Sequence, residues 1–101
     1  MSCNRARIGG RLEFRKALRF TPAGIAVIEF AILHRSQQFE AGAQRQVDCE
    51  VLAMAVEAVA QQVAKFPKHA QVQAEGFLDR ISRTQRELIL HVEKIELIEE
   101  R

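Results

Sequence analysis

LEFRKALRFTPAGIAVIEFAILHRS, residues 12–36, holds two apolar-rich segments on either side of one turn signal. The turn signal is Thr21-Pro22-Ala23-Gly24. Proline fixes φ near the value that the second position of a type I turn requires, and Gly24 can adopt the positive φ that closes such a turn. The stretch therefore predicts a β-hairpin of two long strands.

The segment before the turn alternates between apolar and charged residues. Ile8, Gly10, Leu12, Phe14 and Leu18 share one parity, while the other parity carries Arg7, Arg11, Glu13, Arg15 and Arg19. Alternation with a period of two predicts a first strand over about residues 5–20. Residues 1–4 before it are expected to be a loose terminus. Gly9-Gly10 inside the strand predicts a bulge or a sharp coil where the sheet closes a barrel.

The segment after the turn is apolar on both faces. Ile28, Phe30 and Ile32 lie on one face, while Val27, Ala31 and Leu33 lie on the other. A strand with this pattern needs cover on both sides. One face can pack into a barrel core, and we expect a second copy of the chain to cover the other face. A homodimer is the predicted assembly.

The rest of the chain is expected to contain three more strands and one helix. Residues 36–44 predict a loop, and residues 45–51 predict a strand with Val47, Cys49 and Val51 inward. Apolar residues then recur at helical spacing from Leu52 to Phe66, where Pro67 ends the run. Strands are predicted over residues 70–78 and 88–98, with a polar loop at 79–87. The last segment would also suit a helix, but its β-branched residues favour a strand.

Length and composition indicate one domain covering residues 1–101. The net charge of +2 is small, but basic residues gather between residues 4 and 19 and again between 80 and 86. Such clusters fit an anionic partner, and a solvated strand face is the alternative. Two cysteines are too few for a disulfide framework and favour a reduced cytoplasm. Neither a signal peptide nor a membrane span is predicted.

Catalysis and metal binding are not expected from the residues. His34, His69 and His91 lack the spacing of metal ligands relative to the two cysteines. No nucleophile, base and orienting acid can be assembled, and no glycine-rich phosphate loop is present in the sequence. We therefore expect a protein that is not an enzyme and needs no cofactor or metal.

Several motifs carry a resemblance to a known family. They are TPAGI at 21–25, LHRSQQFEAG at 33–42, EGF at 75–77 and LHVEKIELIE at 90–99. With the order β-β-β-α-β-β, the chain resembles the primosomal replication protein N (PriB) family over residues 4–99. The resemblance implies an all-β fold with one helix, a five-stranded OB-fold Greek-key barrel.

The resemblance also implies a function. Members of this family form dimers, bind single-stranded DNA and associate with the PriA helicase, with DnaT as a further partner where it exists. Arg19 matches the family's basic position before the hairpin turn, and Arg35 is the arginine of HRS. DNA contacts are expected from Lys16, Arg19, Arg35, Arg80, Arg83 and Arg86.

Two aromatic residues are candidates for base stacking. Phe39 lies in the predicted loop, where we expect its ring to fold onto the barrel rim rather than stand free. Phe77 falls on the polar parity of its strand, so it is expected either on a binding face or at a dimer contact. Ala43 and Asp48 stand where better-known family members carry aromatics. Since stacking contributes about 1–3 kcal/mol per base, weaker DNA binding or a shifted footprint is expected.

Two other functions stay open at this stage. The chain could be a dimeric docking module for the helicase with little DNA binding of its own, which the missing aromatics favour. It could also be an OB-fold module for single-stranded RNA.

Overall fold

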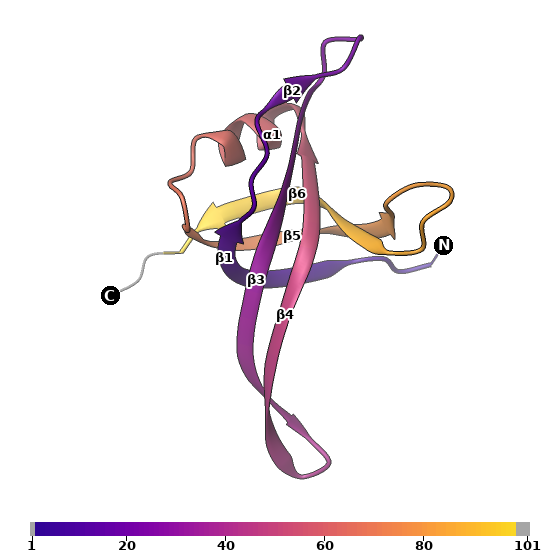
Figure 1. Cartoon of the computed structure of the whole chain (residues 1–101). Coiled ribbons are helices and arrows are strands. Elements are labelled where there is room, and N and C mark those ends of the chain that lie inside the picture. The colour runs from indigo at the N-terminus through magenta and orange to yellow at the C-terminus, as the bar shows by residue number, and fades with distance from the viewer. Residues whose placement is uncertain (1, 99–101) are drawn as a thin grey trace.

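The computed structural model describes residues 2–98, and in them it has six strands and one helix (Figure 1). In chain order the elements are β1 (Ala6–Glu13), β2 (Arg19–Phe20), β3 (Ala26–Glu40), β4 (Ala43–Val56), α1 (Glu57–Ala64), β5 (Gln71–Arg80) and β6 (Leu88–Leu97). β1 and β2 occupy the predicted first strand. The predicted order of three strands, a helix and two strands is confirmed, with the first strand interrupted.

The strands form one closed sheet with the order β1-β5-β6-β4-β3-β2, in which β1 also pairs with β3. β4 and β6 run parallel, and the other neighbours are antiparallel. Counting β1 and β2 as one interrupted strand, this is a five-stranded Greek-key barrel. The predicted OB-fold is confirmed.

The barrel closes where β1 changes partners. Arg11 lies opposite Gln71 of β5 and also opposite Leu33 of β3. A Cβ atom placed on Gly10 would overlap the Leu33 carbonyl group. Glycine thus permits the close approach of two backbones. The barrel closes next to the Gly9-Gly10 pair as predicted, but both glycines pair regularly with β5 and form no bulge there.

The hairpin turn at residues 21–24 is confirmed. Gly24 has a φ of 82°, and its amide donates to the Thr21 carbonyl at 2.8 Å. The Ile25 amide donates to Thr21 Oγ1 at 3.1 Å. The threonine side chain therefore supports the turn that proline and glycine begin.

The first strand is shorter than predicted. β1 ends at Glu13, and Phe14 follows with a φ of 46°, a value that bulky residues rarely adopt. Its ring is exposed, although its parity predicted an inward position. Arg15 then donates from Nη1 to the Val63 carbonyl at 3.0 Å and to the Phe66 carbonyl at 2.5 Å. Pairing with the end of α1 replaces the expected strand.

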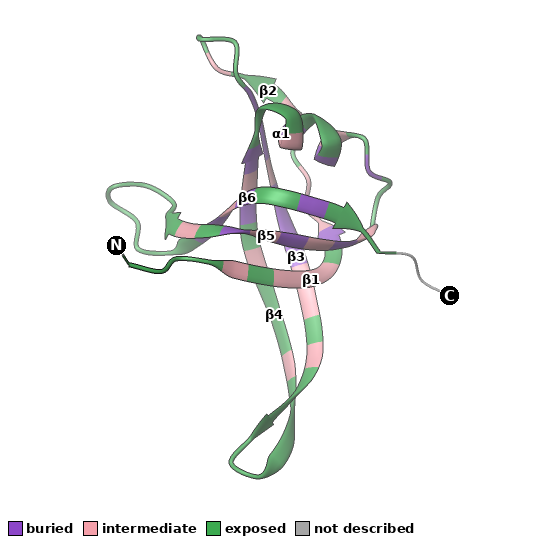
Figure 2. Cartoon of the chain, turned by 180° about the vertical axis from the view of Figure 1, so that it is seen from behind, coloured by how far each residue is buried: buried purple, intermediate pink, exposed green. Residues whose placement is uncertain are grey.

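The predicted loop at 36–44 is wrong. β3 runs on to Glu40 and β4 begins at Ala43, so the two strands form a ribbon that extends beyond the barrel (Figures 1 and 2). Ala41 and Gly42 have φ values of 53° and 78°, as a two-residue type I′ turn requires. Cys49, which was predicted inward, is exposed because it lies on this ribbon.

The helix begins later than predicted. Residues 52–56 continue β4, where Ala53 and Ala55 are buried opposite Phe30 and Ile28. The spacing of four residues between Leu52 and Val56 suits a helix as well as a strand, and pairing with β3 decides between them. α1 keeps only residues 57–64 and buries Ala60 and Val63 against the barrel.

Both faces of β3 are covered within one chain at their centre. Ile28, Phe30 and Ile32 belong to the barrel core, while Val27 and Ala31 on the opposite face are 4% and 0% exposed. A second copy is therefore not needed to cover these two residues. The homodimer stays a prediction on other grounds.

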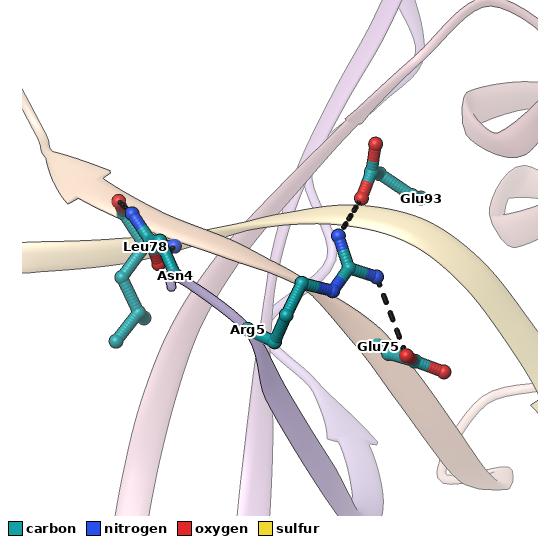
Figure 3. Close-up of polar contacts among 5 residues, drawn as sticks. All are labelled: Asn4, Arg5, Glu75, Leu78 and Glu93. Carbon is teal, nitrogen blue, oxygen red and sulfur yellow. Dashed lines mark hydrogen bonds and ion pairs between the residues drawn. The ribbon is translucent and has the colours of Figure 1, made fainter. Parts of the chain in front are cut away.

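The start of the chain is tied to β5 and β6, in contrast to the expected loose terminus. Asn4 donates from Nδ2 to the Leu78 carbonyl at 2.8 Å and accepts from the Leu78 amide at 2.9 Å (Figure 3). Arg5 bridges Glu93 and Glu75, which raise its pKa, Glu93 the more strongly (Figure 3). Glu93 is thus part of the barrel, while Met1 and residues 99–101 lie outside the described residues.

Candidate nucleic-acid interface

One face of the sheet formed by β2, β3 and β4 collects several of the predicted DNA contacts. Ile28 and Ile32 mark the core side of β3, so odd-numbered β3 residues lie on the outer side. Arg35 and Phe39 are odd-numbered, and Arg19 of β2 lies opposite Val27 on the same side. The structure therefore places these three predicted residues on one outer face.

This outer face is long. Arg19 lies beside Val27 near one end of β3, and Phe39 lies at the far end of the ribbon. At about 3.3 Å per residue, the distance from Val27 to Phe39 along the strand is roughly 40 Å. The ribbon accounts for much of this length, so the face extends well beyond the barrel (Figure 1).

Phe77 adjoins the same face through two neighbouring strands. It lies opposite His91 of β6, and the two rings stack with centroids 4.8 Å apart. His91 in turn lies beside Met54 of β4, which faces outward opposite Glu29 of β3. The Phe77 side chain is partly exposed, at 36%. An aromatic pair of this kind offers one surface on which a base could stack.

Phe39 does not fold onto the barrel rim, so that expectation is wrong. Its residue is 73% exposed near the tip of the ribbon, two residues before the Ala41-Gly42 turn. The ring lies too far along the ribbon to reach the barrel rim. Phe39 is therefore free for an external contact.

The basic side chains of this face form ion pairs with carboxylates. Arg35 donates from Nε to Asp48 Oδ1 at 2.7 Å across the strand pair. Hydrogen bonds from Arg35 and then Gln46 hold the pKa of Asp48 below its usual value. The side chains of Arg35 and Asp48 are exposed, at 80% and 53%. The arginine can therefore exchange partners without breaking a buried contact.

Glu29 likewise pairs with Lys16 and Arg19, two residues that are predicted to contact DNA. Its carboxylate is 3.5 Å from Arg19 and 3.9 Å from Lys16. Lys16 lies in the segment between β1 and β2, where its backbone amide donates to the Glu29 carbonyl at 2.9 Å. Lys16 and Arg19 thus flank one carboxylate on the outer face.

The three loop arginines differ from those of the ribbon. Arg80 ends β5, while Arg83 and Arg86 lie in the loop to β6. Within residues 2–98, none of the three forms an ion pair. The loop leaves the barrel in a different direction from the ribbon and the 21–24 turn (Figure 1). The structure therefore does not bring this cluster beside Arg19 or Arg35.

Some exposed aromatic groups were not identified from the sequence. Phe20 is 61% exposed beside the hairpin turn, and Phe14 is 73% exposed after β1. His91 was considered only as a metal ligand, yet it stacks on Phe77. The position of Phe20 next to the turn could have predicted its exposure. The stacking of Phe77 on His91 could not be predicted, because it depends on the register of β5 and β6.

The interface has the chemistry of anion and base contacts. Arginine forks suit phosphate oxygens, and exposed rings suit bases. In the part of the chain that the structure describes, no three His, Cys, Asp or Glu side chains gather to hold a metal ion. No helix there is long and apolar enough to cross a membrane.

Known proteins share this sequence and fold. A family model described as "Another single-strand binding protein family" matches residues 4–94. The replication restart protein PriB of Nitrosomonas europaea is 33% identical over 95 residues, which cover 94% of this chain and 88% of that protein. The PriB of Erwinia tasmaniensis is 31% identical over 105 residues, with 98% and 97% covered.

Solved structures agree with these relatives. A PriB structure from Ralstonia solanacearum superposes with a TM-score of 0.85 at 25% identity, covering 96% of this chain and all of that one. The single-stranded DNA binding protein of Thermus aquaticus gives a TM-score of 0.80 at 23% identity and shares the fold, with 98% of this chain and 52% of that chain covered. The chain therefore belongs to the single-strand binding protein family that includes the PriB replication restart proteins.

Proposed function

We propose that the protein binds single-stranded DNA and acts as an accessory factor in the restart of DNA replication. The observation that carries this proposal is the outer side of β2, β3 and β4, which carries Arg19 beside the buried Val27 and then, past the buried Ala31, Arg35 and Phe39, all within roughly 40 Å along β3. The loop arginines 80, 83 and 86, which form no ion pair among residues 2–98, add a second source of positive charge. Backbone charge and few aromatics favour little discrimination between sequences.

Partners and assembly belong to the same proposal. The names of the relatives support a place in replication restart. The PriA helicase as partner, and DnaT where it exists, are proposed from the resemblance to the family. A homodimer is supported by Ala6–Ile8 of β1, which pairs with β5 along one edge and has no strand partner along the other within the described residues. Sedimentation would separate a dimer of twice 11.5 kDa from a monomer. The proposed role is non-catalytic and cytoplasmic.

Fluorescence anisotropy tests the DNA binding directly. Labelled oligo-dT and a matched duplex would be titrated with the protein over a salt series. We expect preference for the single strand, with affinity falling as salt rises. Each phosphate contact contributes about −0.7 to the logarithmic salt slope. Replacing Arg19 and Arg35 by alanine should therefore make the salt slope less negative by about 1.4.

A matched control is Lys68→Gln. Lys68 is exposed in the segment after α1, which lies on the side of the barrel away from the β5–β6 loop (Figure 1). This variant should bind like the unaltered chain, since it loses one charge outside the interface. Absence of binding by the unaltered chain at low salt would refute the DNA-binding proposal.

A docking module for the helicase is the second candidate function. The ion pairs of Arg19 and Arg35, together with Ala43 and Asp48 on the ribbon, favour weak intrinsic DNA binding. Tight helicase binding beside negligible oligo-dT binding would establish it. Competition between oligo-dT and oligo-U would distinguish the RNA-binding alternative.

A further inference from the structure

A cleft of about 590 Å³ opens where β1 leaves the β3–β4 ribbon, and Arg35 and Asp48 both line it. Its volume lies in the range of about 300–1,000 Å³ that small-molecule sites occupy. The walls come from four strands. They are formed by Gly10, Arg11, Leu33, His34, Arg35, Asp48, Cys49 and Gln71.

The wall of the cleft is held by a hydrogen-bonded histidine. His34 Nδ1 is 2.7 Å from the Gly9 carbonyl, and Nε2 is 2.7 Å from Ser36 Oγ. A carbonyl only accepts, so Nδ1 donates to Gly9. His34 thereby joins β1 to β3 at the point where the two strands separate. The cleft is thus a built feature of the fold.

The arginine–carboxylate pairs at the cleft have the chemistry of arginine–phosphate contacts. Arg35 offers its guanidinium to Asp48 at 2.7 Å, and Arg11 offers a second guanidinium, which pairs with Glu13 at 2.9 Å. A phosphate presents oxygens like those of a carboxylate to an arginine fork. The side chains of Arg11, Arg35 and Asp48 are about half exposed or more, so an external anion can reach the two arginines.

We propose that this cleft is a phosphate-binding subsite for single-stranded DNA in which Asp48 competes with the DNA phosphate for Arg35. The inference rests on the proposed DNA binding and adds a residue that sets its strength. Binding at this subsite is then an exchange: Arg35 stops donating to the Asp48 carboxylate and donates to the phosphate instead. The loop arginines, which pair with no carboxylate in the described part of the chain, bind without such an exchange.

Asp48→Asn and Glu50→Gln form a matched pair of variants. Glu50 is two residues further along the same face of β4, is exposed, and forms no ion pair within residues 2–98. Each variant removes one negative charge from the face, but only Asp48→Asn releases Arg35. Exposed ion pairs are worth a factor of about 1.4 to 5. We expect oligo-dT affinity to rise by about two- to fivefold in Asp48→Asn and by less than half of that gain in Glu50→Gln.

The Arg35→Ala background isolates the exchange. Asp48→Asn should give no gain there beyond that of Glu50→Gln, because no arginine remains to be released. Equal gains from both variants in the unaltered chain would overturn the proposal, as would a specific Asp48→Asn gain that persists without Arg35. Circular dichroism of each variant confirms that the fold is kept.

Cys49 gives a second measurement inside the cleft. Its thiol is exposed, and the other cysteine, Cys3, can be replaced by serine. Saturating oligo-dT should slow alkylation of Cys49 by iodoacetamide, and it should not do so in Arg35→Ala. An unchanged alkylation rate in a chain that does bind oligo-dT would refute the cleft while leaving the proposed function intact. If the unaltered chain does not bind oligo-dT at low salt, the proposed function and the subsite both fail.

Discussion

Replacing Gly10 by alanine should strongly destabilise the barrel, while the same change at Gly9 should not. A Cβ atom on Gly10 would overlap the Leu33 carbonyl oxygen and lie 2.9 Å from the carbonyl carbon. It would also lie 2.8 Å from Cγ2 of Ile32, a fully buried side chain. At Gly9 the nearest atom is the Val72 carbonyl oxygen at 3.6 Å, an ordinary contact.

The expected size of the effect follows from what must move. Overpacking a core costs about 1–3 kcal/mol, and the upper end applies because the Leu33 backbone is held in β3 between β1 and β4. For a domain of this size, about 3 kcal/mol lowers the melting temperature by roughly 12–24 °C. Gly9→Ala should instead be neutral or stabilising by about 0.5 kcal/mol, since alanine loses less backbone entropy than glycine.

Far-UV circular dichroism is the suitable assay, because the chain has no Trp or Tyr for fluorescence. Thermal and urea unfolding of both variants would be compared at one protein concentration, which holds any dimerisation constant. Equal midpoints for the two variants would refute the claim that β1 and β3 touch at Gly10.

Three further outcomes follow from the structure. Gly76→Ala should cost about 3 kcal/mol in urea unfolding, because its Cβ would overlap the His91 carbonyl at the β5–β6 irregularity; a stable variant would contradict that register. Arg15→Met should lower the unfolding free energy by about 1–2 kcal/mol in the same assay, through loss of two hydrogen bonds to the end of α1, and an unchanged urea midpoint would exclude that role. The Asp48 pair with Arg35 should stabilise the fold above the ordinary pKa of 3.8 and lose this contribution as the pH falls through the lowered pKa. Acid unfolding of Asp48→Asn should show no such contribution, and a matching profile would count against the pair.

The candidate site was only partly accessible from sequence. Arg19 and Arg35 were identified by resemblance, but their shared face needed the register of β2, β3 and β4. The Arg35–Asp48 pairing follows from the turn at Ala41-Gly42, which lacks the asparagine or aspartate that usually marks a type I′ turn. Without that turn, Asp48 could be named as a departure from the family but not as the partner of Arg35.

Local chemistry was enough for the features that depend on neighbours in the chain. The 21–24 turn follows from proline and glycine geometry, alternation predicts β5, and β-branched residues favour β6 over a helix. The OB-fold itself was predicted from the order of elements together with the motifs that resemble the PriB family. These features are encoded within a few residues of each other.

Tertiary structure decided what depends on residues distant in sequence. Residues 52–56 belong to β4 and not to the predicted helix, because they pair with β3. β1 ends at Glu13, and Arg15 hydrogen-bonds to the end of α1 instead of continuing the strand. The length of the ribbon, the exposure of Phe39 and the ion pairs of the outer face also depend on strand pairing. Periodicity records which side of a strand a residue takes, but the partner on the next strand is set only when the chain folds.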